Sequence, residues 1–474
     1  MEDLKADVVV VGSGAAGLCA ALTAVLGGAR VVVLEKMSKI GGFSLTTHGM
    51  FAAESVLQNR DFVDVTKDKA FKTHMHQTHW CANGRLVRAF IDKSASSIDW
   101  LMDLGVEYTS VQTLWPGGPR TWHVMKGSGK LLIQALADKI KEKGGEIITE
   151  TPAEKFLTDK KNRVIGVVAR GKDGNTLRID TRAVIIAGGS YANNREMIKK
   201  YTNLPFEAPA IVEMQQTGDH IKMAWEAGAA PDGMGVFMAI SRIPNEKSRS
   251  HLWAAAFQPL LWVNRLGERF CDESVSFYFP ISANVLAKQP DGIMYTIFDE
   301  TTKKKLLEKG TDVSLGVYAP VTTKLANLND DIKRGSKEGK VFVADSIKEL
   351  AEKISIDRKA LQETIAEYNE SCRENYDKIF SKDRKYLQPV ENKKFYAIKS
   401  TFHIFATLGG IKINHKTEVL NETFDVIPGL YAAGNCAGGM YESSYEIFTT
   451  GGALGFAVNS GRIAGENSLK YLSK

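Results

Sequence analysis

The chain has 474 residues, of which 44% are hydrophobic and 24% charged, as is typical of a globular protein with two or three domains. The net charge is +6 and basic residues alternate with acidic ones, so we expect no nucleic-acid partner. The five scattered cysteines form no CxxC pair, and no apolar run reaches ~18 residues. These features predict reduced thiols, no membrane span and a cytoplasmic location.

The first predicted unit is a strand, a glycine turn and a helix. Residues 7–11 are a β-branched run typical of a buried parallel strand, and an Ala/Leu-rich helix follows the turn GSGAAG. Such a turn binds a pyrophosphate with the N–H groups at the helix N-terminus, and its glycines allow a tight turn, close backbone approach and close helix–strand packing. The residues predicted to lie at the cofactor here are Gly12, Gly14, Ala15, Ala16 and Gly17.

A second strand, residues 30–34, ends at Glu35. An acidic residue at this spacing is placed to accept a hydrogen bond from a ribose hydroxyl and disfavours a 2′-phosphate, so FAD or NAD is favoured over NADP. The loop that follows can lie along the dinucleotide and donate to a flavin ring, which favours FAD. It contributes Lys36, Gly41, Gly42 and Ser44 to the predicted site.

Further along the chain we expect helices over residues 85–105 and 127–145, and a β-meander within residues 145–189. The meander ends in a strand followed by Ala187, Gly188 and Gly189, and a similar strand near the end of the chain is followed by Gly434 and Asn435. Both strands are predicted to return to the nucleotide-binding sheet and to present bare backbone to the cofactor.

Three histidines, His74, His76 and His79, lie within seven residues. They share no i, i+4 face and have no neighbouring cysteine or carboxylate pattern, so we predict a solvated helix face and no metal.

The motifs VVVVGSGAAGLCAA, AVIIAGG, TGDHIKMAWEAGA, GERF, FYAIK, TLGGIKIN and GLYAAGN occur in this order over nearly the whole chain. In this respect the chain resembles the FAD-dependent flavoproteins of the fumarate reductase and succinate dehydrogenase class, a superfamily that includes the 3-ketosteroid dehydrogenases. The resemblance implies an α/β fold. A Rossmann-like FAD-binding domain of the glutathione-reductase type would be formed by residues 1–237 and 404–474, with an α+β clamp domain, residues 238–403, inserted between them. It also places Asp219, Gly452, Ala453 and Leu454 at a non-covalently bound FAD, although His48 lies near the position of the histidine that anchors flavin in some relatives.

In fumarate reductases the GERF-like motif carries an arginine that donates a proton, and Arg269 has the matching position here. Its alternative role is a salt bridge with Asp272 or Glu273. The rest of the fumarate-binding pattern is missing, since Ala406 replaces a histidine and Tyr445 replaces a second arginine. Specificity for a dicarboxylate is therefore not expected.

Tyrosine at position 445 resembles the ketosteroid dehydrogenase pattern, in which a phenol donates to the substrate ketone. Tyr278 lies one residue beyond the position of a second tyrosine of that family, and Phe277 takes the aligned position. Tyr441 is a weaker candidate for the pocket. Four tryptophans would border the cleft if they are not core residues: Trp115, Trp122, Trp253 and Trp262.

We therefore predict an FAD-dependent oxidoreductase that transfers hydride between flavin N5 and the β-carbon of an α,β-unsaturated ketone, as an ene-reductase or a ketosteroid-type dehydrogenase. Tyr445 would polarise the carbonyl, and Arg269 or Tyr278 would handle the α-proton. The alternatives are a fumarate reductase-like enzyme for small unsaturated carboxylates and a non-catalytic flavin-binding redox module. Because the sequence carries no haem, Fe–S or second dinucleotide motif, we expect a separate electron donor or acceptor.

Overall fold

The computed structural model describes residues 2–114, 117–211, 214–247, 250–314, 319–441 and 444–474. The fold is mixed α/β, and its main sheet has the strand order β17–β18–β11–β2–β3–β7. All neighbouring strands are parallel except β17, which is antiparallel to β18. The strands are β2 (Val8–Val11), β3 (Val31–Leu34), β7 (Glu146–Ile148), β11 (Ala183–Ile186), β17 (Glu418–Leu420) and β18 (Val426–Ala432). The valine and isoleucine runs of β2, β3 and β11 are buried throughout, as in a sheet covered on both faces.

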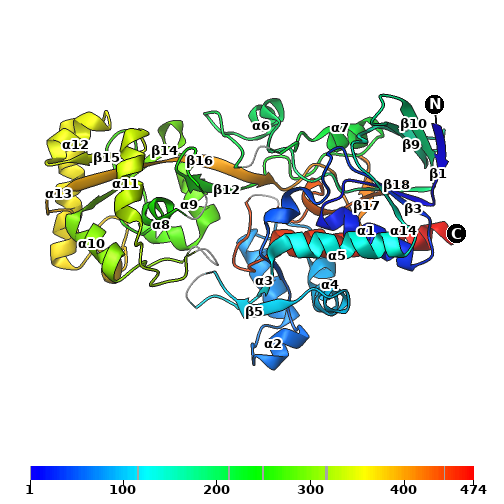
Figure 1. Cartoon of the computed structure of the whole chain (residues 1–474), viewed down its shortest axis with the longest axis horizontal. Helices are drawn as coiled ribbons and strands as arrows, with labels where there is room; N and C mark the ends of the chain where they lie inside the picture. Colours follow the sequence, from blue (N-terminus) through cyan, green and yellow to red (C-terminus); the bar gives the residue numbers. More distant parts are fainter. Residues whose placement is uncertain (1, 115–116, 212–213, 248–249, 315–318, 442–443) are drawn as a thin grey trace.

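Three helices run side by side along this sheet (Figure 1): α1 (Ala15–Leu26), α5 (Ser128–Glu142) and α14 (Gly452–Leu472). Helices α1 and α14 are in very close contact, because a Cβ added at Gly461 would lie 2.3 Å from the Ala16 carbonyl oxygen, and one at Gly465 would lie 2.7 Å from that of Ala20. These contacts advance in the same direction along both helices. The two helices are therefore parallel, and both N-termini point to the same end of the sheet.

A second sheet, in the order β1–β10–β9–β8, lies near both termini of the chain (Figure 1). It comprises β1 (Glu2–Lys5), β8 (Ala153–Thr158), β9 (Val164–Arg170) and β10 (Thr176–Asp180). The last three pair antiparallel in sequence order, which confirms the predicted β-meander.

The third sheet is built around one long strand, β16 (Phe395–Thr407). One half of β16 pairs with β14 (Ile293–Asp299) and β15 (Val341–Ala344), and the other half pairs with β12 (Phe237–Arg242). Strand β13 (Leu261–Val263) completes the sheet beside β14. Figure 1 shows β16 as the long orange strand that runs from this region toward the main sheet.

In the described ranges, six helices lie between the strands of the third sheet in sequence. They are α8 (His251–Ala256), α9 (Phe279–Leu286), α10 (Glu300–Glu308), α11 (Leu328–Lys337), α12 (Ile347–Lys353) and α13 (Arg358–Glu374). The 3-10 turns of this part are η2 (Glu273–Phe277), η3 (Pro290–Gly292) and η4 (Arg384–Tyr386).

A small sheet of β4 (Gly49–Phe51), β6 (Trp122–Met125) and β5 (Tyr108–Gln112) lies below the main sheet in Figure 1, with α2 (Val56–Arg60), α3 (Lys67–Gln77) and α4 (Gly84–Asp103). The remaining elements are α6 (Arg195–Tyr201), α7 (Asp219–Glu226), η1 (Gly42–Thr46) and η5 (Gly434–Cys436). None of the helices in the described ranges combines the length and the hydropathy needed to cross a bilayer.

Candidate active site

Gly12 and Gly17 allow the turn between β2 and α1 to pack tightly. Gly12 has φ +105°, and a Cβ there would lie 2.6 Å from the Ala187 carbonyl oxygen. A Cβ at Gly17 would lie 1.9 Å from the Gly12 carbonyl oxygen. Any larger residue would therefore separate the turn from β11 or from its own helix, and the predicted packing roles of these two glycines are confirmed.

Glu35, directly after β3, is 8% exposed and points to the same turn. Its Oε2 accepts hydrogen bonds from the Ser13 backbone N–H at 3.1 Å and the Ser13 hydroxyl at 2.5 Å, and its Oε1 accepts from the Met37 N–H at 2.8 Å. The carboxylate is thus fixed beside the start of α1. Ser44 contributes from the next loop, because its hydroxyl accepts from the Ala15 N–H at 3.0 Å.

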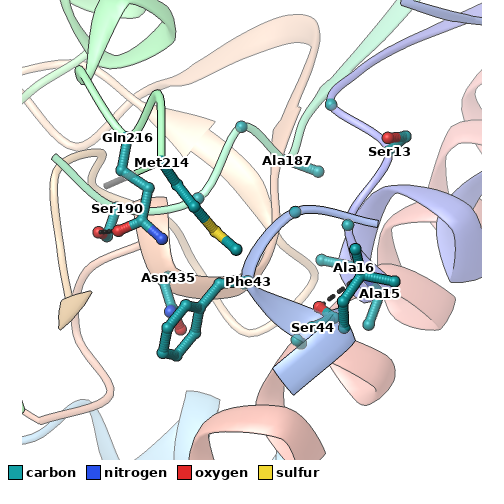
Figure 2. Close-up of a pocket in the computed structure, with 18 of the residues that line it drawn as sticks. Ser13, Ala15, Ala16, Phe43, Ser44, Ala187, Ser190, Met214, Gln216 and Asn435 are labelled. Carbon is teal, nitrogen blue, oxygen red and sulfur yellow. Dashed lines mark hydrogen bonds between the residues drawn. The ribbon is translucent and has the colours of Figure 1, made fainter. Parts of the chain in front are cut away.

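A cavity of about 360 Å³, here called the glycine-lined cavity, opens at this end of the main sheet. Figure 2 shows Ser13, Ala15 and Ala16 toward one end of it, and Phe43, Met214, Gln216 and Asn435 toward the other. The structure brings most of the predicted cofactor residues to this lining: Gly12, Gly14, Ala15, Ala16, Glu35, Lys36, Gly42, Ser44, Ala187, Gly188, Gly189, Gly434, Asn435, Ala453 and Leu454.

Four predicted cofactor residues lie just outside the lining. Gly17 is covered by the turn, and Gly41 donates its N–H to the Ser13 hydroxyl at 3.1 Å. Asp219 lies at the start of α7 and pairs with Lys36 at 3.1 Å. Gly452 begins α14, where it faces the hydroxyls of two tyrosines. Gly17, Gly41 and Asp219 each contact a lining residue from outside the cavity: Gly12, Ser13 and Lys36, respectively.

The lining residues fit a dinucleotide. The N-terminal ends of α1 and α14 both reach the cavity, so backbone N–H groups and the positive ends of two helix dipoles face it. Glu35 offers a carboxylate at one end, and the glycine and alanine backbone after β11 and β18 leaves room for a flat ring system. Donor groups, carboxylate and bare backbone together form a cradle for phosphates, a ribose and a flavin.

A second cavity of about 230 Å³, here called the aromatic cavity, adjoins the first. The two cavities share Phe43, Thr47, Met238, Ala453 and Leu454 as lining residues. Aromatic side chains surround the second cavity: Phe43, Trp122, Trp253, Phe257, Phe277, Phe279, Phe405 and Tyr445. Its described lining residues include no lysine, arginine, aspartate or glutamate.

Tyr445 lines the aromatic cavity, as its predicted role requires. Burial raises the pKa of its phenol, the nearby Glu446 carboxylate raises it further, and the backbone N–H of Ala453 partly offsets both effects. The phenol is therefore protonated near neutral pH and is available as a hydrogen-bond donor.

The tryptophans and Tyr441 divide between the cavity and the core. Trp122 and Trp253 line the aromatic cavity, whereas Trp262 is a buried residue outside this lining, with its indole N–H donating to the Gln258 carbonyl at 3.2 Å. Trp115 lies outside the described residues. Tyr441 is 2% exposed and lies behind Tyr445, with ring centroids 5.1 Å apart.

Arg269 lies at neither cavity. It forms a buried group that we call the Arg269 cluster, in which its guanidinium binds Glu273 at 2.8 Å and Asp377 at 2.7 Å, while Lys382 binds Glu273 at 3.0 Å. Burial opposes the charge on Arg269, but the two carboxylates outweigh it and raise the pKa above its ordinary value. This geometry favours the alternative salt-bridge role, with Glu273 as the partner.

Tyr278 is also outside the aromatic cavity lining. Its ring stacks on Phe448 with centroids 5.0 Å apart, and burial raises the pKa of its phenol. Phe277, the last residue of η2, lines the cavity instead. The backbone therefore brings the aligned position to the cavity, but the residue there has no hydroxyl.

The prediction that the three neighbouring histidines form a solvated helix face is wrong for His74. His76 and His79 are exposed, but His74 is 1% exposed, and its Nδ1 lies 3.3 Å from Glu446 Oε2. Helix α3 packs against the segment around Tyr441, and this long-range contact has no signal in the sequence near His74.

Several lining residues were not predicted. Met214, Gln215 and Gln216 reach the glycine-lined cavity from an irregular segment, and the Ser190 hydroxyl donates to the Gln216 side chain at 2.6 Å. Phe43 lines both cavities. Because it follows the predicted cofactor residue Gly42 directly, the sequence could have indicated this position. Phe257 after α8, Phe279 of α9 and Phe405 of β16 meet only in the folded chain.

This fold and site define a flavoprotein. Residues 7–448 match the family described as FAD binding domain. The chain is 35% identical over 480 residues to the vinyl phenol reductase of Lactiplantibacillus plantarum, covering 98% of this chain and 96% of that protein. It is 31% identical to a fumarate reductase (cytochrome) of Shewanella frigidimarina, covering 99% of this chain and 78% of that protein. Among solved structures, a 3-ketosteroid Δ1-dehydrogenase from Sterolibacterium denitrificans superposes with a TM-score of 0.83 at 20% identity, covering 99% and 100% of the two chains.

The chain belongs to this family of FAD-binding proteins, as its sequence motifs indicated. It is an FAD-dependent oxidoreductase that acts on carbon–carbon double bonds.

Proposed function

We propose that this enzyme reduces small, uncharged, planar alkenes in which the double bond is conjugated to an oxygen atom, namely one-ring enones and 4-vinylphenol-type compounds. The observation that carries the proposal is the aromatic cavity, which combines Tyr445 with flat apolar walls and has no charged side chain among its described lining residues. Its volume of about 230 Å³ is below the roughly 300–1,000 Å³ of sites for drug-sized ligands, which favours a single ring. The extensive identity to a vinyl phenol reductase supports the same substrate class.

The neutral lining argues against a carboxylate substrate. A carboxylate moved from water into an apolar cavity loses its hydration, and the loss is large unless cationic or strong hydrogen-bond donors replace it. Arg269 cannot serve this purpose in the observed geometry, because two carboxylates already neutralise it. Reduction of small unsaturated carboxylates is therefore the weaker alternative.

The chemistry follows from the position of Tyr445. FAD, when bound in the glycine-lined cavity, supplies the hydride from its reduced ring. The Tyr445 phenol donates a hydrogen bond to the substrate oxygen and stabilises the negative charge that develops there. In an enone that charge is an enolate oxygen, and the α-carbon then takes up a proton.

A 4-vinylphenol uses the same donor through its ring. Proton transfer to the terminal carbon, with loss of the phenolic proton, gives a quinone methide, whose carbonyl accepts the hydrogen bond from Tyr445. Hydride then adds at the benzylic carbon, and the oxygen recovers a proton, so that the alkene gains one hydride and one proton overall. The aromatic walls hold the planar ring against the shared side of the two cavities. The same site can catalyse the reverse reaction on a saturated ketone when an electron acceptor is supplied.

The domain arrangement is part of this proposal. Residues 1–237 and 404–474 would form a Rossmann-like FAD-binding domain in two segments, and residues 238–403 a clamp domain that closes over the substrate. In support, the parallel main sheet takes strands from both outer segments, and the aromatic cavity has walls from both parts. The proposed boundaries fall within β12 and β16, the strands at which the chain passes between the two regions.

We propose non-covalent binding of FAD, a separate electron donor and a cytoplasmic location. His48 lines the aromatic cavity rather than the glycine-lined one, which supports non-covalent binding. All five cysteines are free, which suits a reducing compartment.

The test is anaerobic reoxidation of the chemically reduced enzyme, followed by flavin absorbance. Separate additions of cyclohex-2-enone, 4-vinylphenol, 4-vinylanisole and fumarate distinguish the substrate classes. We expect reoxidation by the enone or the vinylphenol, and none by 4-vinylanisole, whose methyl ether cannot form the quinone methide. Reoxidation by fumarate alone would contradict the proposal and favour the carboxylate alternative.

A further inference from the structure

The proposed reaction consumes one proton for each hydride. Among the described residues that line the aromatic cavity, the ionisable side chains are Tyr445 and His48. If Tyr445 gives its proton to the substrate, the phenolate left behind would lie near the Glu446 carboxylate in a buried site. Two neighbouring negative charges in such a site are unstable, so the phenol must recover its proton quickly.

Directly behind Tyr445 lies a buried group with no role in the site as described so far. Tyr441 is 2% exposed, and its ring centroid is 5.1 Å from that of Tyr445 and 5.5 Å from that of His74. His74 and Glu446, each 1% exposed on their side chains, approach to 3.3 Å. The rings of Tyr445, Tyr441 and His74 are therefore consecutive neighbours. His74 Nε2 is bonded to the Met440 carbonyl oxygen at 2.8 Å, so that Nδ1 is the ring nitrogen beside Glu446.

Two polar atoms in this group make no hydrogen bond within the described ranges: the Tyr441 hydroxyl, and His74 Nδ1, whose contact with Glu446 at 3.3 Å is an ion-pair distance without hydrogen-bond geometry. A buried hydroxyl without a partner is unfavourable and uncommon in folded proteins. The same hydroxyl lies 3.0 Å from the point where a Cβ would stand on Gly452, and the Tyr445 hydroxyl lies 3.9 Å from that point. Both phenol hydroxyls thus lie within 4 Å of the same point beside Gly452.

We propose that the His74–Glu446 pair, acting through Tyr441, restores the proton that Tyr445 gives up during each reduction. This relay rests on the proposed function of the aromatic cavity. Tyr445 is the catalytic residue, and Tyr441, His74 and Glu446 are positioning residues that act through it.

The steps balance as follows. The Tyr445 O–H bond breaks as its proton passes to the substrate, while the two electrons arrive with the hydride. The Tyr441 hydroxyl gives its proton to the Tyr445 phenolate, and the protonated His74 imidazole gives the proton on Nδ1 to Tyr441, because Nε2 is bonded to the Met440 carbonyl oxygen. Glu446 remains a carboxylate that stabilises the imidazolium, and solvent later returns a proton to His74.

Tyr441→Phe is the main test, because it removes only the hydroxyl that lacks a partner. We expect anaerobic reoxidation of the reduced holoenzyme by 4-vinylphenol, or by cyclohex-2-enone if only the enone reacts, to slow at least tenfold, since positioned acid–base groups contribute about 100- to 10,000-fold. The solvent deuterium isotope effect on this step should rise, because proton recovery becomes rate-limiting. The melting temperature should not fall, and reduction by dithionite should be unchanged. The matched control is Tyr295→Phe, which removes another buried phenol hydroxyl, one that donates to the Ile354 carbonyl away from both cavities.

A double-mutant cycle with His74→Gln separates a relay from independent packing effects. If the two residues act in one path, the double variant should be no slower than the slower single variant. Gly452→Ala gives a further test, since its methyl group would separate the two hydroxyls without changing an ionisable group.

Two outcomes would overturn the relay. One is a Tyr441→Phe rate within about twofold of wild type with an unchanged isotope effect, and the other is a pair of effects that multiply in the double variant. If the wild-type enzyme is reoxidised by neither alkene, the proposed function itself is overturned and the relay with it. If the wild-type enzyme is reoxidised normally but one of these two outcomes is found, the relay is wrong and the proposed function stands.

Discussion

The aromatic cavity and the Arg269 cluster contain the two kinds of residue that the sequence predicted to be catalytic, and they differ in how their polar groups are satisfied. Tyr445 is a neutral phenol among apolar walls. Arg269 is a buried cation whose guanidinium binds two carboxylates, and its neighbour Lys382 shares one of them. A donor in an open cavity can act on a substrate, whereas a fully paired cation is committed to holding the fold. A motif position therefore predicts chemistry only when the folded chain leaves its side chain available.

Arg269→Met should have the largest effect, and it should be on stability. Removing the cation leaves Glu273 and Asp377 buried without their main partner, and such a change costs about 3 to 5 kcal/mol. Denaturant unfolding of wild type and variant measures this loss. The rate of alkene-dependent reoxidation per folded holoenzyme should stay within about threefold. A much larger fall in this rate would restore Arg269 as the proton donor.

Tyr445→Phe should show the opposite pattern. Loss of one donor to a developing oxyanion slows the chemical step about 100- to 1,000-fold, which corresponds to about 2.7 to 4 kcal/mol. Stopped-flow reoxidation by 4-vinylphenol or cyclohex-2-enone measures the rate, and the melting temperature and FAD content should change little. Equal rates in variant and wild type would remove Tyr445 from the mechanism and leave it as a wall of the cavity.

The free energy of unfolding should depend on pH through Asp377, a member of the Arg269 cluster. Burial opposes ionisation of Asp377, but the hydrogen bond from Arg269 outweighs it and lowers the pKa to about 2, compared with an ordinary value of 3.8. The stability from this carboxylate, about 2 kcal/mol, is therefore present above pH 4 and is lost as the pH falls toward 2. In urea unfolding, the stability difference between wild type and Asp377→Asn should shrink over this range. A difference that is constant from pH 7 to pH 3 would contradict the depressed pKa.

Tyr278→Phe should have the smallest effect. The phenol lies outside the aromatic cavity lining, and its ring contact with Phe448 is preserved by phenylalanine. Its reoxidation rate should stay within about twofold of the wild-type rate. The comparison variant is Phe277→Tyr, which adds a hydroxyl at the position that does line the cavity. A large loss in Tyr278→Phe would indicate that the cavity rearranges when substrate binds.

Much of the cofactor region could be predicted because its signals are local. Gly12, Gly17 and Glu35 lie within one strand–helix–strand unit, where backbone geometry is set over a few residues. Met214 and Gln216 were missed because they reach the cavity from an irregular segment, which has no periodicity to read.

The sequence by itself determined the dinucleotide-binding unit, the family and the presence of a tyrosine at position 445, where the fumarate reductase pattern predicts an arginine. Only the tertiary structure decided which of the polar residues face a cavity. Arg269 forms a buried ion pair with Asp377, and His74 contacts Glu446 in the core. In each case the partner lies far away in the chain. The charge state and availability of a side chain depend on the neighbours that folding supplies, and those contacts leave no local pattern in the sequence.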